Sequence, residues 1–189
     1  MKALCVYCGS NTGTGGQYVA VARELGSVLV TNGIGLVYGG ASKGLMGVLA
    51  DAVLGAGGKV QGVIPKALLD REIAHPGLDE LHIVNSMHER KFMMAELSDG
   101  FIAMPGGFGT LEEIVEMLTW AQLGIHAKPC GLLNAGGYFD HLLAFFGHAE
   151  AQGFVRPAHR HMLLVEAQAA RLIERLAGYE APRVSKWLR

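Results

Sequence analysis

The stretch GFIAMPGGFGTLEEIVEML, residues 100–118, contains the transition that decides the fold. It begins with a short apolar run, residues 100–104, which predicts a buried strand. A glycine-rich turn follows, and apolar residues then recur at the spacing of an amphipathic helix over residues 111–123. A strand that passes through glycines into a helix is the repeating unit of parallel α/β sheets.

The same alternation recurs along all 189 residues. The other apolar runs predict strands at 3–9, 35–39, 59–64, 81–85, 129–134 and 162–165. The other helical patterns lie at 17–31, 45–55, 87–97, 138–152 and 167–176. This order predicts an α/β fold, a Rossmann-like doubly wound parallel sheet of about seven strands with helices on both faces. With no linker or internal repeat, we expect a single domain over residues 1–189, in which residues 178–189 form a loosely held tail.

The composition excludes several classes of protein. Glycine accounts for 27 residues, charged residues make up 17%, and 16 Lys and Arg balance 17 Asp and Glu to a formal charge of -1. This balance carries no general attraction to nucleic acids or to acidic membranes. No apolar run reaches the ~18 to 20 residues of a membrane span, and no signal peptide is evident. We therefore expect a cytoplasmic protein that binds neither nucleic acid nor membrane.

Cysteines and histidines give no sign of a disulfide framework or a metal site. The three cysteines are too few for a disulfide framework, which is typical of a reducing compartment. Cys5 and Cys8 form a CxxC, but they lie in a strand-like run and should point to opposite faces of the strand. The eight histidines show no zinc-type spacing, so no metal is expected.

Three glycine-rich turns lie where a predicted strand meets a predicted helix. They read GSNTGTGG at 9–16, GGASKGLMG at 39–47 and PGGFGTLEE at 105–113. Such turns let a backbone approach a ligand closely and offer the N-H groups of a helix start to a phosphate. In the first two turns the candidates for substrate contact are Ser10, Gly39 and Gly40. Tight turns without a ligand would explain any single one of the three.

The spacing within these turns excludes two common nucleotide motifs. Residues 39–44 have the glycine spacing of a Walker A loop, but Leu45 stands where its lysine should be. The first turn is not GxGxxG, and no acidic residue follows the second strand to bind a ribose diol. Triphosphates and dinucleotides are therefore disfavoured as ligands.

Glu113 has two interpretations from its spacing. Thr110 fits the N-cap of the third helix, which would place Glu113 in the first helical turn, facing the crevice. The same spacing matches a capping box, in which Glu113 would serve the helix start and no ligand.

Arg90 is harder to explain by structure alone. Ser86 and Glu89 match a second capping box, which places Arg90 early in its helix, where a cation opposes the helix dipole. Arg90 also shares the apolar face of that helix. An anionic partner or ligand is the favoured interpretation, and a stem that extends out of the core is the alternative.

Taken together, these residues resemble a known family. MHERK at 87–91, PGGFGTLEE at 105–113 and TWAQLGIHAKP at 119–129 resemble the LONELY GUY (LOG) family of cytokinin riboside 5'-monophosphate phosphoribohydrolases. The resemblance runs from Cys5 to about Asn134. It implies a homodimeric nucleotide-binding enzyme without a cofactor, which cleaves the N-glycosidic bond of a nucleoside 5'-monophosphate into free base and ribose 5-phosphate.

The resemblance also implies roles for individual residues. Arg90 and Glu113 would form the catalytic pair. The 5'-phosphate would be held by Gly106, Gly107, Gly109 and Thr110, while Glu72 and Lys91 would touch the substrate and Thr119 would line the base pocket. Two positions depart from the family pattern, since Asn11 replaces a second serine and Ala41 replaces a third glycine.

Two other functions remain open alternatives. Many members of this family carry the older label of lysine decarboxylase, which would require pyridoxal phosphate on a lysine, and no lysine has an evident Schiff-base setting. A nonenzymatic carrier of a nucleotide or phosphorylated cofactor could use the same fold and loop, although it would not need both Arg90 and Glu113. The preferred base, adenine or an N6-modified adenine, is not determined by spacing.

Overall fold

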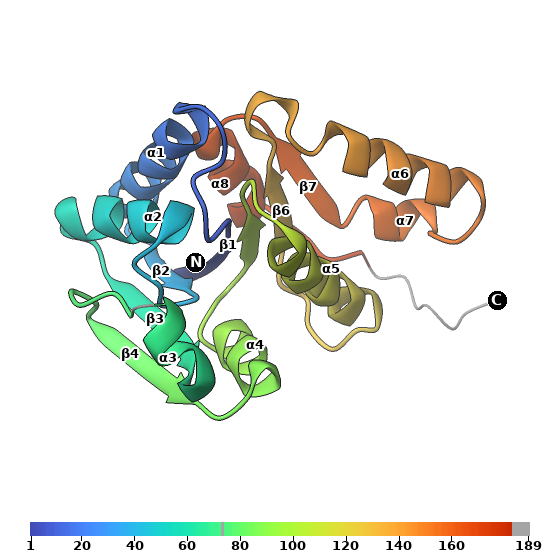
Figure 1. The fold of residues 1–189 in the computed structure, drawn as a ribbon. Coiled ribbons are helices and arrows are strands. Elements are labelled where there is room, and N and C mark those ends of the chain that lie inside the picture. Colours follow the sequence, from blue (N-terminus) through green and yellow to red (C-terminus); the bar gives the residue numbers. More distant parts are fainter. Residues whose placement is uncertain (73, 183–189) are drawn as a thin grey trace.

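One parallel sheet of seven strands runs through the molecule (Figure 1). The computed structural model describes residues 1–72 and 74–182, and for residues 70–72 the backbone alone. The strands are β1 Ala3–Tyr7, β2 Gly35–Tyr38, β3 Val60–Pro65, β4 Glu80–Val84, β5 Phe101–Ala103, β6 Cys130–Leu133 and β7 Leu163–Glu166. Their order is β4-β3-β2-β1-β5-β6-β7, and every neighbouring pair is parallel. The predicted α/β class and doubly wound sheet are confirmed.

Helices fill the connections between the strands. They are α1 Gln17–Thr31, α2 Gly44–Gly55, α3 Lys66–Glu72, α4 Met87–Glu96, α5 Phe108–Gln122, α6 Asp140–Ala151, α7 Pro157–Arg160 and α8 Ala169–Ala177, with a 3-10 turn at Ala135–Gly137. Six were predicted, and α3 and α7 were missed. The helix α3 follows Pro65 directly and has only seven residues, which is too short for an apolar period to stand out.

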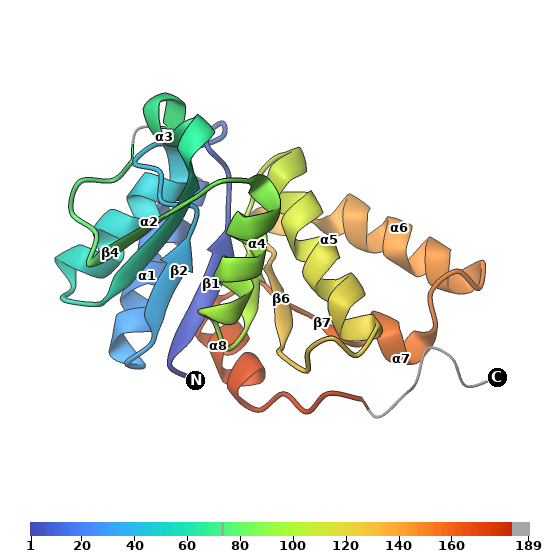
Figure 2. The same ribbon diagram turned by 90° about the horizontal axis from the view of Figure 1, so that it is seen from below.

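Two hydrophobic clusters cover the two faces of the sheet. The first includes residues of α1, α2 and α8, and the second includes residues of α4 and α5. Figures 1 and 2 show these two sets of helices on opposite sides of the strands. Cys5 belongs to the second cluster and Cys8 to the first, so the prediction that they point to opposite faces of the strand is confirmed.

The strand order reverses between β1 and β5. From β1 the chain winds outward through β2 and β3 to β4, and it then returns to the other side of β1 to form β5. In open α/β sheets ligands bind beyond the carboxyl ends of the strands at such a reversal. The three glycine-rich turns follow β1, β2 and β5, so all of them border this position.

The C-terminal segment is only partly described. After α8, Tyr179 packs against the first cluster and its N-H donates to Leu176 O (3.3 Å). Residues 183–189, which form most of the predicted tail, lie outside the described residues. Of the helices described, none has the length and hydropathy to cross a membrane.

Candidate active site

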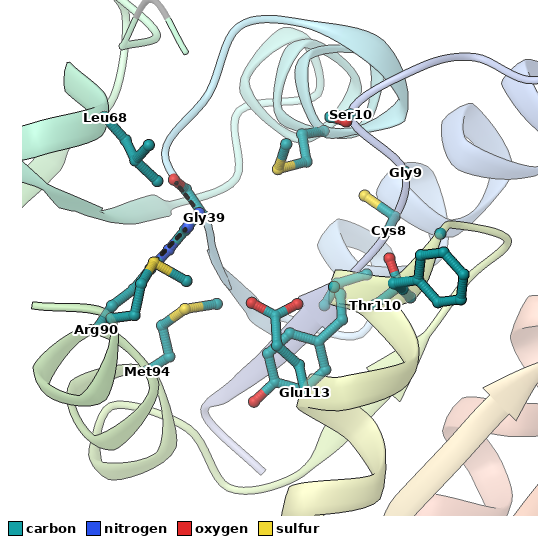
Figure 3. Close-up of a pocket in the computed structure, with 16 residues that line it drawn as sticks. Cys8, Gly9, Ser10, Gly39, Leu68, Arg90, Met94, Thr110 and Glu113 are labelled. Carbon is teal, nitrogen blue, oxygen red and sulfur yellow. Dashed lines mark hydrogen bonds between the residues drawn. The ribbon is translucent and has the colours of Figure 1, made fainter. Parts of the chain in front are cut away.

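A cavity of about 290 Å³ opens at the reversal of the strand order. Its walls come from the ends of β1 and β2 and from α3, α4 and α5. Of the predicted site residues, the structure brings seven together here: Ser10, Gly39, Arg90, Gly107, Gly109, Thr110 and Glu113. Figure 3 shows that the side chains of Arg90 and Glu113 extend from different helices into the same space.

Arg90 is a buried cation at the wall of this cavity. Its residue is 5% exposed, and Nη2 donates a hydrogen bond to Gly39 O (2.9 Å) at the end of β2 (Figure 3). A Cβ atom added at Gly39 would lie 2.2 Å from this same Nη2. Gly39 thus leaves room for the guanidinium and accepts one of its hydrogen bonds.

The start of α4 is capped as predicted. Ser86 Oγ accepts from Glu89 N (3.1 Å), and Glu89 Oε2 accepts from Asn85 N (2.8 Å). The helix therefore begins at Met87 and places Arg90 in its first turn. The guanidinium crosses to the β2 end, so it does not extend to solvent in the way that the alternative interpretation required.

Glu113 brings a negative charge close to the floor of the cavity. Burial raises the pKa of the Cys8 thiol, and the charge of Glu113 raises it further. Burial also raises the pKa of Cys5, to which the charge of Glu113 adds while the charge of Arg90 opposes it. Both charges of the predicted pair therefore act on Cys5, in the middle of β1.

The beginning of α5 corrects one prediction. The helix starts at Phe108 with Gly107 as its N-cap, three residues before the predicted start. Thr110 is therefore inside the helix, and Glu113 lies in its second turn, so the N-cap assignment of Thr110 and the capping box are both wrong. The pattern misled because glycines are poor helix formers, yet here two of them, at 107 and 109, stand at the helix start. The purely structural interpretation of Glu113 loses its basis.

The start of α5 offers unused backbone donors to the cavity. Leu111 N is the first to donate within the helix, to Gly107 O (3.2 Å). The N-H groups before it have no acceptor in the helical pattern and carry the positive end of its dipole. Gly107 and Gly109 line the cavity at this point, which creates a site suited to a phosphate.

Other glycines of the three turns hold the loops against one another. A Cβ at Gly106 would lie 2.1 Å from Thr110 Oγ1, and a Cβ at Gly44 would lie 2.2 Å from the carbonyl carbon of Ser10. Gly9 N donates to Pro105 O and Gly9 O accepts from Leu45 N, both at 3.0 Å. At Gly107 and Gly109, in contrast, a Cβ would have no neighbour within 4 Å among the described atoms. Chain packing therefore explains the first group and does not explain these two.

Four predicted site residues do not line this cavity. Gly40, at φ +78°, accepts from His75 N (2.9 Å), and Gly106 lines a neighbouring hollow beside Tyr138. Thr119 Oγ1 donates to Val115 O (2.8 Å) and faces a second cavity between α5 and α7. Lys91 pairs with carboxylates of α5. The side chain of Glu72, at the end of α3, lies outside the described part of the chain.

Sequence reasoning missed the apolar wall of the cavity. Leu68 of α3 lines it, as do Met46, Met87 and Met94. Met94 is buried in the core, whereas Met87 is 43% exposed at the cavity. Leu68 brings the short helix α3, which no sequence pattern predicted, to the wall of the cavity.

The described residues contain few groups suited to other chemistries. Within residues 1–72 and 74–182, no three His, Cys, Asp or Glu side chains are arranged to hold a metal ion. All three cysteines are free and buried. No lysine is among the described side chains that line the cavity. None of those side chains could therefore form a Schiff base with pyridoxal phosphate.

The arrangement suits a reaction that develops charge on a phosphorylated substrate. The start of α5 can hold an anion, a carboxylate lies one turn further along the same helix, and a guanidinium faces it from α4. A carboxylate stabilises a developing cation, and a guanidinium stabilises a developing or permanent anion. Cleavage of a glycosidic bond generates both charges.

Comparison with known proteins agrees with this geometry. Residues 46–176 match the model of a family described as possible lysine decarboxylase. A rice protein, "Probable cytokinin riboside 5'-monophosphate phosphoribohydrolase LOGL9" (Oryza sativa subsp. japonica), is 52% identical over 94% of this chain and 78% of its own. The Arabidopsis thaliana protein "Cytokinin riboside 5'-monophosphate phosphoribohydrolase LOG1" is 50% identical over 98% of this chain and 86% of its own.

Solved structures share the fold at lower sequence identity. The molybdenum cofactor carrier protein of Chlamydomonas reinhardtii aligns with a TM-score of 0.72 at 23% identity, over 94% of this chain and 99% of that one. The molybdenum cofactor binding protein of Rippkaea orientalis aligns with a TM-score of 0.71 at 21% identity, over 94% and 97%. At this identity the likeness extends to the fold alone.

Proposed function

The chain belongs to the LONELY GUY family of cytokinin riboside 5'-monophosphate phosphoribohydrolases, and we propose that it hydrolyses N6-modified adenosine 5'-monophosphates to free base and ribose 5-phosphate. The family membership rests on about half of all positions being identical over nearly the whole chain. The label of possible lysine decarboxylase describes the same family model, but no lysine is among the described residues that line the cavity, where pyridoxal phosphate would need one.

One observation carries the proposal. Arg90 and Glu113 face one cavity, and the open start of α5 forms part of its wall. A helix start with free N-H groups fits a 5'-phosphate, and Gly107 and Gly109 have no packing reason to be glycine. We propose that these two glycines, with Gly106 and Thr110, hold the phosphate.

In the proposed reaction water adds to C1' of the ribose. The base leaves with the electron pair of the C1'-N bond, so positive charge develops on the sugar and negative charge on the base. Water supplies a hydroxyl group to C1' and a proton to the base. The carboxylate of Glu113 stabilises the sugar cation and orients the water. Arg90 anchors the substrate and stabilises the negative charge, held in place by Gly39.

The remaining contacts of the substrate are also part of the proposal. Ser10 and Gly39 line the cavity that would receive the nucleotide. Glu72 of α3 and Gly40, which follows Gly39, would contact the substrate, and Thr119, which lines the separate cavity between α5 and α7, would contact the base. No metal or other cofactor enters the reaction, because water and the two charged side chains supply every group that it needs.

We also propose that the enzyme is a cytoplasmic homodimer. Exposed apolar side chains gather on α4 and α5, where Phe92 is 59% and Phe108 is 94% exposed. A second copy of the chain that covers these side chains would remove them from water and close the cavity. Three free buried cysteines suit a reducing compartment. Light scattering at micromolar concentration should give twice the chain mass of 20.1 kDa, and a monomeric mass would contradict the dimer.

The proposed function is tested by direct product analysis. The purified protein is incubated with AMP and with N6-isopentenyladenosine 5'-monophosphate, and free base and ribose 5-phosphate are followed by chromatography. We expect release from the N6-modified nucleotide, and the comparison with AMP ranks the base preference. Glu113→Gln keeps the size of the side chain and removes its charge, so kcat should fall about 1,000-fold while nucleotide binding persists.

Two outcomes would redirect the assignment. Wild-type turnover in Glu113→Gln would show that the carboxylate takes no part in the chemistry. Binding of both nucleotides without product would favour a carrier of a phosphorylated ligand, which is the second function compatible with this fold. Titration by calorimetry on the same samples separates the two outcomes.

A further inference from the structure

Three charged side chains join the helices that carry Arg90 and Glu113. Lys91 Nζ of α4 lies 2.5 Å from Glu112 Oε1 and 3.0 Å from Glu116 Oε2, both on α5. Lys91 follows Arg90 in the sequence, and Glu112 precedes Glu113. Each catalytic candidate therefore has a neighbour in this ion-pair cluster.

Apolar side chains also join these two helices. Figure 2 shows α4 and α5 side by side over the same face of the sheet. Below the ion pairs, Met94 of α4 and Met117 of α5 belong to the second hydrophobic cluster. The long side chain of Lys91 spans the remaining distance between the helices.

The cluster is placed to be rigid. The side chain of Lys91 is only 8% exposed, whereas those of Glu116 and Glu112 are 26% and 55% exposed. Burial by itself would lower the pKa of Lys91, but its hydrogen bond to Glu112, its ion pair with Glu116 and the charges of both carboxylates together raise the pKa. The ammonium remains charged, and leaving it without its carboxylates would be costly in this setting.

Lys91 does not line the cavity, although the resemblance to the family implies that it touches the substrate. We propose that Lys91 is a positioning residue, which ties α4 to α5 through Glu112 and Glu116 and so fixes the separation of Arg90 and Glu113. This inference rests on the proposed function. Its physical basis is that displacement of a reacting group by about 1 Å can cost about 100-fold in rate.

The test compares variants at both ends of the cluster. Lys91→Met and the double variant Glu112→Gln with Glu116→Gln should each lower kcat between about 10-fold and 100-fold, with KM changed less than about threefold. The triple variant should be no slower than Lys91→Met, because each change breaks the same tie. Lys91→Arg keeps the charge and both carboxylate contacts, so it should recover most of the rate. Glu96→Gln, an exposed carboxylate on α4, is the matched control and should retain full activity.

Two results would overturn the positioning role. If the double glutamine variant keeps the wild-type kcat while Lys91→Met loses it, Lys91 acts on the substrate itself. If Lys91→Met keeps the wild-type kcat, the ion pairs do not position the site. The double variant alters two partly exposed carboxylates, so it remains informative even if Lys91→Met fails to fold.

A second readout separates this inference from the proposed function. Amide hydrogen exchange of α4 should rise at least about threefold in Lys91→Met and in the double variant, and should stay unchanged in Glu96→Gln. This result is independent of which nucleotide is cleaved. Wild-type protein that releases no base but shows this exchange pattern would refute the proposed function and leave the tie between the helices intact. Unchanged exchange in an active enzyme would refute the tie alone.

Discussion

Gly39 and Gly44 of the second turn and Gly107 and Gly109 of the third lie near the same cavity but serve different purposes. In the second turn, Gly39 and Gly44 are glycines because Arg90 and Ser10 occupy the space of a side chain. In the third turn, Gly107 and Gly109 face open space. Glycine-rich turns of similar composition can thus serve the protein's own packing or leave room for a ligand. Three glycine substitutions test this division, in order of the expected effect.

The largest effect should come from Gly44→Ala. This residue has φ +63°, and an added Cβ would lie 2.2 Å from backbone of Ser10. Backbone cannot yield as a side chain can, so we expect a loss of about 4 kcal/mol in the free energy of unfolding. Urea denaturation measures it. Gly57→Ala is the matched control, since its φ of +79° is similar and its surroundings are open, and it should cost about 1 to 2 kcal/mol. Equal losses would mean that the contact between the turns contributes nothing.

Gly39→Ala should damage catalysis more than stability. The added Cβ meets the flexible end of Arg90, which can move away at little cost in folding but then loses its hydrogen bond to residue 39. We expect kcat to fall about 100-fold, or about 2.7 kcal/mol in activation free energy. In Gly35→Ala, at the start of the preceding strand β2, the added Cβ would have no described neighbour closer than 3.6 Å, so this variant should remain active. Both variants are checked by base-release kinetics and thermal melting. Wild-type activity in Gly39→Ala would show that Arg90 does not need the space and the hydrogen bond that Gly39 provides.

Gly109→Ala should weaken substrate binding without lowering stability. Alanine is the better helix former by about 0.8 to 1 kcal/mol, and nothing crowds the position, so stability should not fall. The methyl group would instead enter the proposed phosphate site, and KM for the nucleotide should rise about 10-fold, which corresponds to about 1.4 kcal/mol. Gly147→Ala in α6, also unobstructed, controls for helix propensity. An unchanged KM would place the phosphate elsewhere.

The smallest effect concerns acid stability and lies outside the glycine turns. Burial lowers the pKa of His126 below its ordinary 6.5, and its ring lies 5.3 Å from that of Phe101. As the pH falls, His126 therefore binds a proton in the unfolded chain before it does so in the folded chain. The contribution of the neutral His126 side chain to the free energy of unfolding is complete above pH 6.5 and decreases below it. The ring is half-buried, which limits the effect to under about 1 kcal/mol.

His126→Asn provides the comparison for that effect. Asparagine can still accept the hydrogen bond that Nδ1 takes from Lys128 N (3.1 Å), but it does not titrate. The difference in unfolding free energy between wild type and variant should narrow between pH 6.5 and about pH 5. A difference that is constant with pH would contradict the lowered pKa.

Much of the fold follows from local patterns in the sequence. Within the described residues, all seven strands and six of the eight helices were predicted, because apolar periodicity and the position of glycines are properties of neighbouring residues. The helix α3 was missed, since seven residues after a proline leave no period to detect. The start of α5 was misplaced at Thr110, because glycines that usually break a helix here stand at its beginning.

The sequence by itself determined the α/β class and the three glycine-rich turns. Its motifs also singled out two charged residues, Arg90 and Glu113. Only the tertiary structure decided which glycine serves which purpose. Gly39 and Arg90 are 51 positions apart, and the contacts between Lys91 and the carboxylates of α5 join separate helices. Such contacts form because the sheet brings turns that are distant in the sequence to one edge. The spacing of neighbouring residues carries no information about them.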